Sequence, residues 1–399
     1  MPYAELPMTI LAFATYMRGA PADRPGQARH KENTMLTRIA RRCKLGAPPR
    51  RLRSQTALCS ALAALFGIVA TAAPANAADT VPDHTRVCSS TTSLAFDACL
   101  ASVKDEFSLA TAICLNVGDE DERDKCQKDA DQTRRDGNTE CRDQKRARRD
   151  VCVLLGEGRY DPDFDPEFFT DPFSNINPYF PLAAGDQSKF VGGGEVNVIE
   201  VLDHTKSIEG VTCAVVHDQV LVDDIVTEDT DDWFAQANDG DVWYCGEETA
   251  EFETFDGDNP IVPELVNTDG SFKAGRNGDK AGIAFLAAPE IGRTYRQEFS
   301  LSNAEDMAQI VSTTYRYGDD PDLDDLVPAD LANLLCNGDC IVVYEFTPLS
   351  PDAAERKYYA PQIGQFLEVD LTGENISQLV DCNYDPRCAE LPPPPAPTH

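Results

Sequence analysis

A set of aromatic, charged and amide side chains in the second half of the chain has the composition of a ligand-binding pocket. Aromatic rings form the walls of such pockets, and a few charged groups orient the ligand. We therefore predict that these residues capture a small or extended ligand; the alternative is cross-strand aromatic packing with ion pairs. The set comprises Trp233, Gln236, Trp243, Tyr244, Glu247, Tyr295, Arg296, Glu298, Lys357 and Tyr359.

Sequence signatures of several common enzyme classes are absent. The chain contains no HExxH, GxSxG or CxxCH, and no GxxxxGK followed by Ser or Thr. Zinc-peptidase, nucleophile-elbow hydrolase, c-type haem and P-loop chemistry therefore lack support. We expect no cofactor and a non-catalytic binding or structural function. The alternative is an extracytoplasmic hydrolase that uses Glu247 or Glu298 as a carboxylate catalyst, with bound calcium.

Carboxylates that alternate along a proline-rich segment form a candidate calcium site. Asp161, Asp163 and Asp165 occur in YDPDFDPEFF. Alternate carboxylates on an extended chain can converge on a hard cation, although no EF-hand spacing is present. His204 and His217 could meet across neighbouring strands, but two ligands make a poor metal site.

Cysteine spacing predicts a ladder of disulfide bonds. Cys88, Cys99, Cys114, Cys126, Cys141 and Cys152 are separated by 11, 15, 12, 15 and 11 residues, which reads the same in both directions. Facing residues of an antiparallel helical hairpin have a constant index sum, and steps of 11 and 15 stay near whole helical turns. The predicted pairs are Cys88 with Cys152, Cys99 with Cys141 and Cys114 with Cys126. A metal cluster is the competing interpretation, but structural zinc sites favour CxxC-type pairs.

Capping signals predict a helix on each side of the central cysteine pair. The stretch from Ser89 to Val117 contains neither Gly nor Pro. Asp119 can cap a second helix that Gly156 ends, although Gly137 could bend it and shift the outer pairs. Such a hairpin has little apolar core, so the crosslinks are expected to staple it. Its polar second helix would serve as a solvated strut or a partner-binding surface.

The remainder of the chain predicts strands. Segments such as EVNVIEVLDH, VTCAVVHDQVLV and CIVVYEFTPL are short, rich in Val, Ile and aromatic residues, and separated by turns. The expected fold class is α+β: a disulfide-stapled helical hairpin, then an antiparallel all-β domain forming a curved sheet, an open barrel or a sandwich. Cys382 and Cys388 form the easiest local disulfide. The pairing of the other four cysteines stays open, and these are Cys213, Cys245, Cys336 and Cys340.

These patterns divide the chain into five segments. Residues 1–77 are a leader with a signal peptide whose true start is expected at Met35. The others are the helical hairpin (78–157), a linker rich in Pro, Asp and aromatic residues (158–190), the acidic antiparallel β domain (191–390) and a Pro-rich tail (391–399).

The leader and the charge indicate location and partners. Basic residues, an apolar run and the small-residue site Ala75-Asn76-Ala77 predict cleavage near Ala77 and a periplasmic or secreted protein. The alternative is a retained membrane anchor, for which the apolar run is short. The chain has 68 acidic and 35 basic residues, for a net charge of −33. Such a surface repels phosphate backbones and anionic lipids, so we expect no nucleic-acid partner and no membrane partner after cleavage. The expected partner is a small molecule, a cation or an envelope or extracellular component.

Four segments resemble those of a bacterial family of secreted proteins without an established activity. They are DDWFAQANDGDVWYCGEETAEF, TYRQE, TPLSP and KYYAPQIGQFLEVD, and the resemblance covers most of residues 195–380. A DW-aromatic-AQ strand, a turn and a VWY-x-GE strand mark that family. The cysteine hairpin followed by GRYDPDFDP is similar to the front end of some relatives. The resemblance implies no activity and assigns no catalytic residue.

Overall fold

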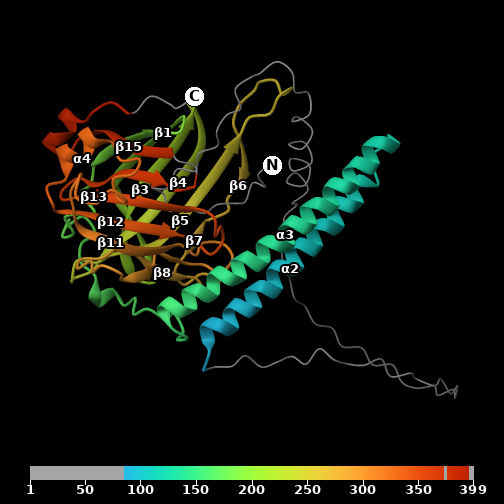
Figure 1. Cartoon of the computed structure of the whole chain (residues 1–399), viewed down its shortest axis with the longest axis horizontal. Helices are drawn as coiled ribbons and strands as arrows, with labels where there is room; N and C mark the ends of the chain where they lie inside the picture. Colours follow the sequence, from blue (N-terminus) through green and yellow to red (C-terminus); the bar gives the residue numbers. More distant parts are fainter. Residues whose placement is uncertain (1–84, 373–374, 395–399) are drawn as a thin grey trace.

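The protein consists of a long helical hairpin attached to one large antiparallel sheet (Figure 1). This computed structural model describes residues 85–372 and 375–394. The predicted α+β class, with a helical hairpin ahead of an antiparallel sheet, is confirmed. The expected signal peptide, its cleavage site and the end of the Pro-rich tail lie outside the described residues.

Two helices, α2 (Val87–Cys114) and α3 (Glu120–Leu155), form the hairpin. Asp119 caps α3, because its Oδ1 accepts a hydrogen bond from the Glu122 backbone N–H at 3.0 Å. Three acidic residues fill the first turn, where the helix dipole stabilises negative charge. Gly156 ends the helix with a φ of 88°, a conformation that glycine adopts without strain.

Three disulfide bonds join the two helices, in the pairs predicted from the cysteine spacing. They are Cys88–Cys152, Cys99–Cys141 and Cys114–Cys126, with Cα separations of 5.6, 5.8 and 5.5 Å. The nearly equal separations show that the helices stay side by side from the base of the hairpin to its tip. The disulfide ladder is therefore confirmed.

Gly137 does not bend α3, which is continuous from Glu120 to Leu155. The glycine lies where α2 packs tightly against α3, since a Cβ at position 137 would stand 2.9 Å from Cγ2 of Val103. The missing side chain lets the backbones approach, so the glycine preserves the register of the disulfides instead of disturbing it.

The strands are joined into one antiparallel sheet. They are β1 (Gln187–Gly192), β2 (Glu195–Ile208), β3 (Val211–Val222), β4 (Ile225–Gln236), β5 (Val242–Glu253), β6 (Glu264–Asn267), β7 (Phe272–Lys273), β8 (Lys280–Phe285), β9 (Thr294–Arg296), β10 (Glu298–Phe299), β11 (Met307–Tyr315), β12 (Cys340–Phe346), β13 (Ala354–Ala360), β14 (Gly364–Asp370) and β15 (Asn375–Cys382). Short helices η1 (Pro166–Phe168), α4 (Ala329–Leu335) and η2 (Pro386–Glu390) interrupt the connections.

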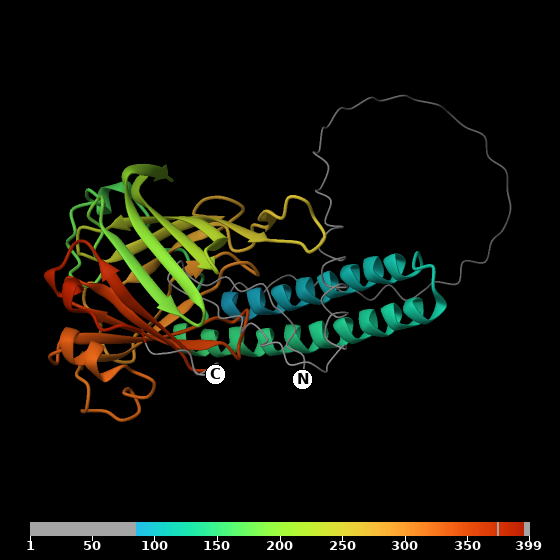
Figure 2. The same cartoon turned by 90° about the horizontal axis from the view of Figure 1, so that it is seen from above.

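The sheet curves until its two ends meet, which gives it a nearly closed barrel shape (Figure 2). The hydrogen-bonded order is β10-β8-β5-β4-β3-β2-β1-β15-β14-β13-β12-β11-β9. Strands β9 and β10 are separated only by Gln297, and they pair with β11 and β8 respectively. At this junction a Cβ on Gly282 would lie 2.0 Å from the Gln297 carbonyl oxygen, so only glycine fits beside the closing segment.

Three further disulfide bonds lie in the sheet region. Cys382–Cys388 is the local bridge expected from the sequence. The four cysteines left open pair as Cys213–Cys245, between β3 and β5, and Cys336–Cys340, between the end of α4 and the start of β12. Spacing alone did not choose between these pairings, because the first bridge spans two strands that are not sequence neighbours.

The first part of the proline-rich linker, residues 160–169, lies across the outer face of the sheet. Phe164 and Phe169 pack against Trp243, with ring centroids 5.8 and 5.9 Å from the indole. Tyr160 packs against Phe299 at 5.0 Å. These aromatic anchors hold a segment that has little regular secondary structure of its own.

The hairpin is attached near its base, and its tip projects away from the sheet (Figures 1 and 2). Arg148 of α3 makes a buried ion pair with Glu305, at 2.7 Å between Nη2 and Oε1. Gln144 donates a hydrogen bond to the Leu349 carbonyl oxygen at 3.0 Å. In the part of the chain that the structure describes, no helix is long and apolar enough to cross a bilayer.

Candidate ligand-binding site

The residues predicted to form a pocket divide between the two faces of the sheet. Buried on the inner face are Tyr244, Glu247, Tyr295, Glu298, Lys357 and Tyr359. Trp233 and Trp243 lie on the outer face beside the Cys213–Cys245 bridge. Arg296 stacks on the Phe299 ring, and the Gln236 Oε1 accepts a hydrogen bond from the Ile176 N–H. The structure therefore brings together the inner six and separates them from the tryptophans and Arg296.

Lys357 is the centre of a buried ionic cluster on the inner face. Its Nζ lies 2.7 Å from Glu345 Oε2, 3.0 Å from Glu355 Oε1 and 3.8 Å from Glu368 Oε2. Burial lowers the pKa of Lys357, but the three carboxylates outweigh it and hold that pKa well above its usual value. Burial and the Glu355 charge raise the pKa of Glu368. One ammonium group faces three carboxyl groups, so we infer that the cluster holds at least one bound proton.

A second buried carboxyl pair shares the hydroxyl of Tyr244. That hydroxyl hydrogen-bonds with Asp232 and with Glu247, at 2.8 Å from Glu247 Oε2. A phenol has only one proton to donate, so one of the two carboxyl groups must be protonated and donate to the phenol oxygen. Burial is the main cause that raises the pKa of Asp232 and of Glu247 well above the usual range. Glu298 shows the same burial-driven rise in pKa.

These raised pKa values predict that the protein loses stability as the pH rises through neutrality. Burial raises the pKa of Asp306 to about 8 and that of Glu228 to about 7. In the unfolded chain such groups ionise near about pH 4. The folded state therefore binds more protons, and the resulting stabilisation is complete below about pH 4 and lost as the pH rises through about 7 to 8.

Urea unfolding measured between about pH 5 and about pH 8 tests this prediction. We expect the midpoint to fall across this range. We also expect Asp306→Asn, which cannot ionise, to flatten the dependence. A wild-type midpoint that rises with pH would contradict the assigned protonation of the inner carboxyl groups.

Burial also restricts what the inner carboxyl groups can catalyse. Glu247 is 3% exposed and Glu298 is 0% exposed. A substrate could contact either carboxyl group only if the sheet opened. The geometry therefore gives the hydrolase alternative no support.

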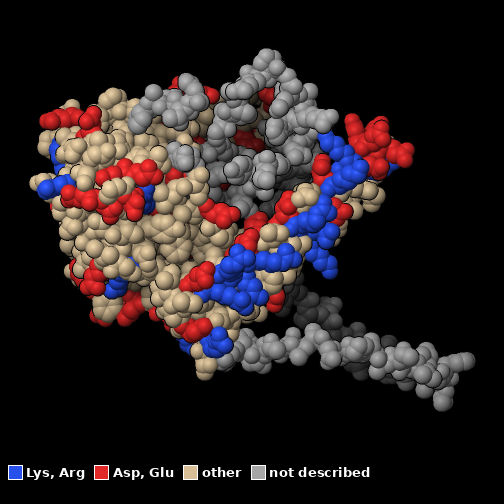
Figure 3. Space-filling model, in the orientation of Figure 1, with Lys and Arg blue, Asp and Glu red and all other residues tan. Residues whose placement is uncertain are grey.

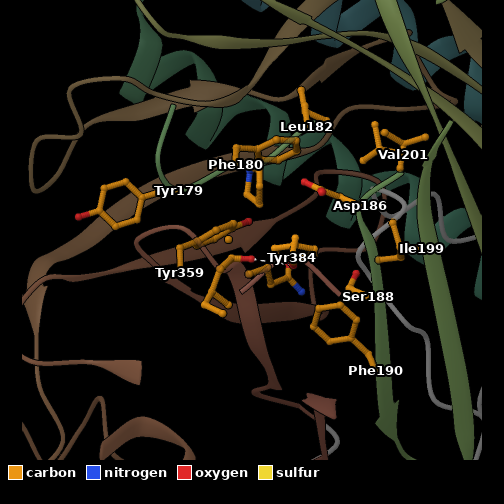
Figure 4. A pocket seen from close by; sticks show the side chains of 15 residues that line it. Tyr179, Phe180, Leu182, Asp186, Ser188, Phe190, Ile199, Val201, Tyr359 and Tyr384 are labelled. Carbon is orange, nitrogen blue, oxygen red and sulfur yellow. Dashed lines mark hydrogen bonds between the residues drawn. The ribbon is translucent and has the colours of Figure 1, made fainter. Parts of the chain in front are cut away.

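A cavity of about 50 Å³ lies on the inner face of the sheet, beneath residues 179–182, which precede strand β1 (Figure 4). Its apolar walls come from β1, β2, β3 and the neighbouring loops, and are formed by Phe180, Pro181, Leu182, Phe190, Ile199, Val201, Val216 and Ile363. Its polar groups are Asp186, Ser188, Tyr359, Gln365 and Tyr384. A space of this size accommodates roughly three to five water-sized groups.

The polar groups of the cavity are a carboxyl, an amide and hydroxyls, without a basic side chain. The Tyr384 hydroxyl donates to the Ile363 carbonyl oxygen at 2.9 Å. Burial and then the Asp186 charge raise the pKa of Tyr384, which places that carboxylate close to the phenol. Tyr359 connects the cavity with the ionic cluster, because it lies two residues after Lys357 on the same face of β13.

Residues 175–182, which we call the strap, form one wall of the cavity. The strap has no helix or strand. Asn177 fixes it to the sheet by donating to the Gly240 carbonyl oxygen at 2.9 Å, and the Pro178 carbonyl oxygen accepts from the Gln362 N–H at 2.6 Å. Pro181 packs closely against Gly364, where an added Cβ would lie 2.8 Å from the proline Cδ. Two hydrogen bonds and one close packing contact therefore hold the strap over the cavity.

The alternating aspartates of the linker are engaged separately. Asp161 accepts a hydrogen bond from Lys280 Nζ at 2.8 Å, and Asp165 caps the η1 turn through the Glu167 N–H. Across residues 85–372 and 375–394, no group of three or more His, Cys, Asp or Glu is arranged to hold a metal ion. Calcium binding by Asp161, Asp163 and Asp165 stays a prediction.

Residue types and spacing do not indicate the cavity walls or most of the inner carboxyl groups. Phe180 and Leu182 lie in the linker, whose aromatic residues are expected from the sequence to anchor it across the β domain, but nothing in the sequence indicates which strands they cover. The inward-facing charged residues do have a recognisable pattern in the sequence. Asp232 is two residues from Phe234, and Lys357 is two residues from Tyr359. A charged residue in phase with buried aromatics on a strand indicates an inward-facing charge.

Comparison with known proteins identifies no family for this chain. No family model and no curated protein matches it. A protein from Bacteroides fragilis, inferred to be exported and described as having a YmcC-like fold, is 12% identical over 51% of this chain and 98% of its own, with a TM-score of 0.27. An inferred lipoprotein from Parabacteroides distasonis is 11% identical over 52% of this chain and 99% of its own, with a TM-score of 0.25. Similarity this low supports no inference about function, and the resemblance to a secreted family stays a prediction.

The structure contains six disulfide bonds, which indicate the compartment of the protein. Disulfides form and persist in oxidising compartments and are rare where thiols are kept reduced. The protein therefore functions outside the cytoplasm, as the sequence predicts.

Proposed function

We propose that the protein is an extracytoplasmic, non-catalytic binding protein that holds a small amphipathic ligand in the cavity beneath the strap. The observation that carries the proposal is the cavity itself, whose apolar walls surround a few convergent polar groups. Small-molecule sites share this combination of walls and polar groups, but most have volumes of roughly 300–1,000 Å³, so this cavity can admit only a small group. The outer tryptophan face is a weaker candidate, because the linker phenylalanines already cover Trp243.

The size and charge of the cavity define the class of ligand. Its volume suits a short alkyl group of roughly three to five non-hydrogen atoms, or the end of a longer chain. Asp186 is the acidic side chain of the lining, and burial raises the pKa of its carboxyl group. It favours a cationic or neutral hydroxyl-bearing end over an anionic one. The proposed ligand is therefore a short-chain amine or alcohol, or a larger molecule that ends in such a group.

Three probes with the same alkyl chain test this proposal: butylamine, butan-1-ol and butyrate. Binding is measured by isothermal titration calorimetry on the disulfide-bonded protein. We expect butylamine and butan-1-ol to bind, and butyrate to bind more weakly by roughly tenfold or more because Asp186 opposes it. Equal binding of all three probes, or binding of none, would contradict the proposed site.

Two variants on one strand distinguish binding in the cavity from nonspecific binding to an acidic protein. Ile199 lines the cavity and is 5% exposed, whereas its neighbour Val198 is 39% exposed and faces away. Ile199→Trp should fill the cavity and abolish binding of butan-1-ol, while Val198→Trp should leave it unchanged. Circular dichroism establishes that both variants are folded. Retained binding in folded Ile199→Trp would place the ligand elsewhere.

A further inference from the structure

The sheet closes through the shortest pairing in its strand order, which we call the seam. Strand β10 pairs with β8 through two residue pairs, Glu298 with Ala281 and Phe299 with Lys280. The pairings on either side of it, β8 with β5 and β9 with β11, each have three. Local opening of a protein starts where the fewest interactions must break, so the seam is the point at which the closed sheet opens most readily.

Two linker residues, Tyr160 and Asp161, hold the seam from the outer face, and we call them the clasp. The Tyr160 hydroxyl donates to the Ala281 carbonyl oxygen of β8 at 2.9 Å, and its ring packs on Phe299 of β10 with the centroids 5.0 Å apart. Asp161 accepts a hydrogen bond from Lys280 Nζ at 2.8 Å, but this contact is largely exposed and contributes little. Tyr160 is therefore the part of the clasp that joins both strands of the seam.

The base of the hairpin fixes the clasp in position. Tyr160 follows shortly after the end of α3 at Leu155. Arg148 of that helix makes its buried ion pair with Glu305, in the connection from β10 to β11. Figure 3 shows the base of the hairpin against the surface of the sheet region and the tip extending beyond it. The hairpin is thus anchored on the β10 side of the seam, while the clasp that follows it reaches β8.

Glu298 lies beneath the seam, on the inner face of the sheet. Its side chain is 0% exposed, and among the described residues neither oxygen of its carboxyl group has a hydrogen-bond partner. Burial and then the Asp306 charge raise the pKa of Glu298 well above its usual value, so the closed sheet holds this group as a neutral acid. The other titratable groups that interact with it are Glu247 and Tyr244 of β5 and Asp232 of β4. A buried carboxyl group without partners becomes hydrated and ionises when water reaches it.

We propose that the seam is a pH-operated gate: β10 separates from β8 as Glu298 loses its proton, and the clasp opposes this opening. In the open gate, hydrated Glu298 ionises at about pH 4, whereas in the closed gate it keeps its proton to a higher pH. The closed gate is therefore fully favoured below about pH 4, and its opening constant rises by up to about tenfold per pH unit above that. The rest of the sheet stays closed, because β2, β3 and β4 are joined by much longer pairings.

Hydrogen exchange followed by mass spectrometry on the full disulfide-bonded chain tests the gate between about pH 6 and about pH 8, after correction for intrinsic exchange rates. We expect the protection of residues 280–282 and 298–299 to fall by about tenfold per pH unit. Glu298→Gln, which has the shape of the neutral acid, should remove most of this fall. Glu290→Gln, at an exposed position between β8 and β9, is the matched control and should leave it unchanged. An equal fall in the two variants would overturn the proposal.

A second pair of variants tests the clasp. Tyr160→Phe removes only the hydroxyl that bonds to Ala281, so we expect seam protection to fall by roughly threefold at each pH. Tyr344→Phe, which removes a hydroxyl from β12, should leave seam protection unchanged. Unchanged protection in Tyr160→Phe would contradict the clasp. Seam amides as protected as those of the β12–β13 pairing would contradict the gate, because exchange would then report unfolding of the whole sheet.

Discussion

Replacing Lys357 with alanine is expected to lower the free energy of unfolding by about 3–5 kcal/mol, because three buried carboxyl groups lose their counter-charge. The ammonium group contacts Glu345, Glu355 and Glu368 and is 1% exposed. Urea unfolding of the wild type and the variant measures the difference. Lys189→Ala, which removes an exposed lysine from β1, is the control and should change the free energy of unfolding by less than about 0.5 kcal/mol.

The cost of Lys357→Ala should depend on pH in a defined direction. The carboxyl groups left behind can become neutral by binding protons, which relieves their repulsion. We therefore expect the variant to lose less stability at about pH 5 than at about pH 8. A loss below about 1 kcal/mol at the higher pH would contradict the ionic cluster, because removing one partner of a buried ion pair strongly lowers the free energy of unfolding.

Replacing Arg148 with alanine is expected to release the base of the hairpin from the sheet. The guanidinium makes three hydrogen bonds to Glu305, which the change leaves as a buried, unpaired carboxylate. Loss of one partner of such a pair costs about 3–5 kcal/mol. Hydrogen exchange should show faster exchange in residues 302–306 and in the last turns of α3. The three hairpin disulfides should remain intact, because they do not depend on this contact.

Arg142→Ala, on the exposed face of the same helix, is the matched control for this change. It removes an arginine without removing a contact to the sheet, so both the unfolding midpoint and the exchange pattern should stay close to the wild type. If Arg148→Ala resembles this control, the hairpin is held to the sheet by contacts other than the Arg148–Glu305 pair.

The hairpin was predictable because its pattern is local and redundant. The mirrored cysteine spacing, the cap at Asp119 and the stop at Gly156 each indicate the same two antiparallel helices. Gly137 was the uncertain point, since a glycine within a helix weakens it in isolation. Its role depends on contact with Val103 of the other helix, which the sequence of α3 does not contain.

The candidate site was only partly predictable, because it depends on which face of each strand points inward. The inner residues Tyr244, Glu247 and Lys357 were identified by residue type. Trp233 and Trp243 were grouped with them although they face outward, where the linker covers Trp243. The closure of the sheet through Gln297 and the position of the strap depend on contacts between distant segments. Pattern and propensity carry no information about such contacts.

A crystal structure of the protein under xenon pressure would decide whether the cavity beneath the strap is open to a ligand. Xenon enters empty apolar cavities and gives a strong anomalous signal. We expect a xenon peak among Phe180, Ile199 and Tyr359 in the wild type, and its loss in Ile199→Trp. A wild-type crystal without a peak there, or one in which side chains fill that space, would contradict the proposed function.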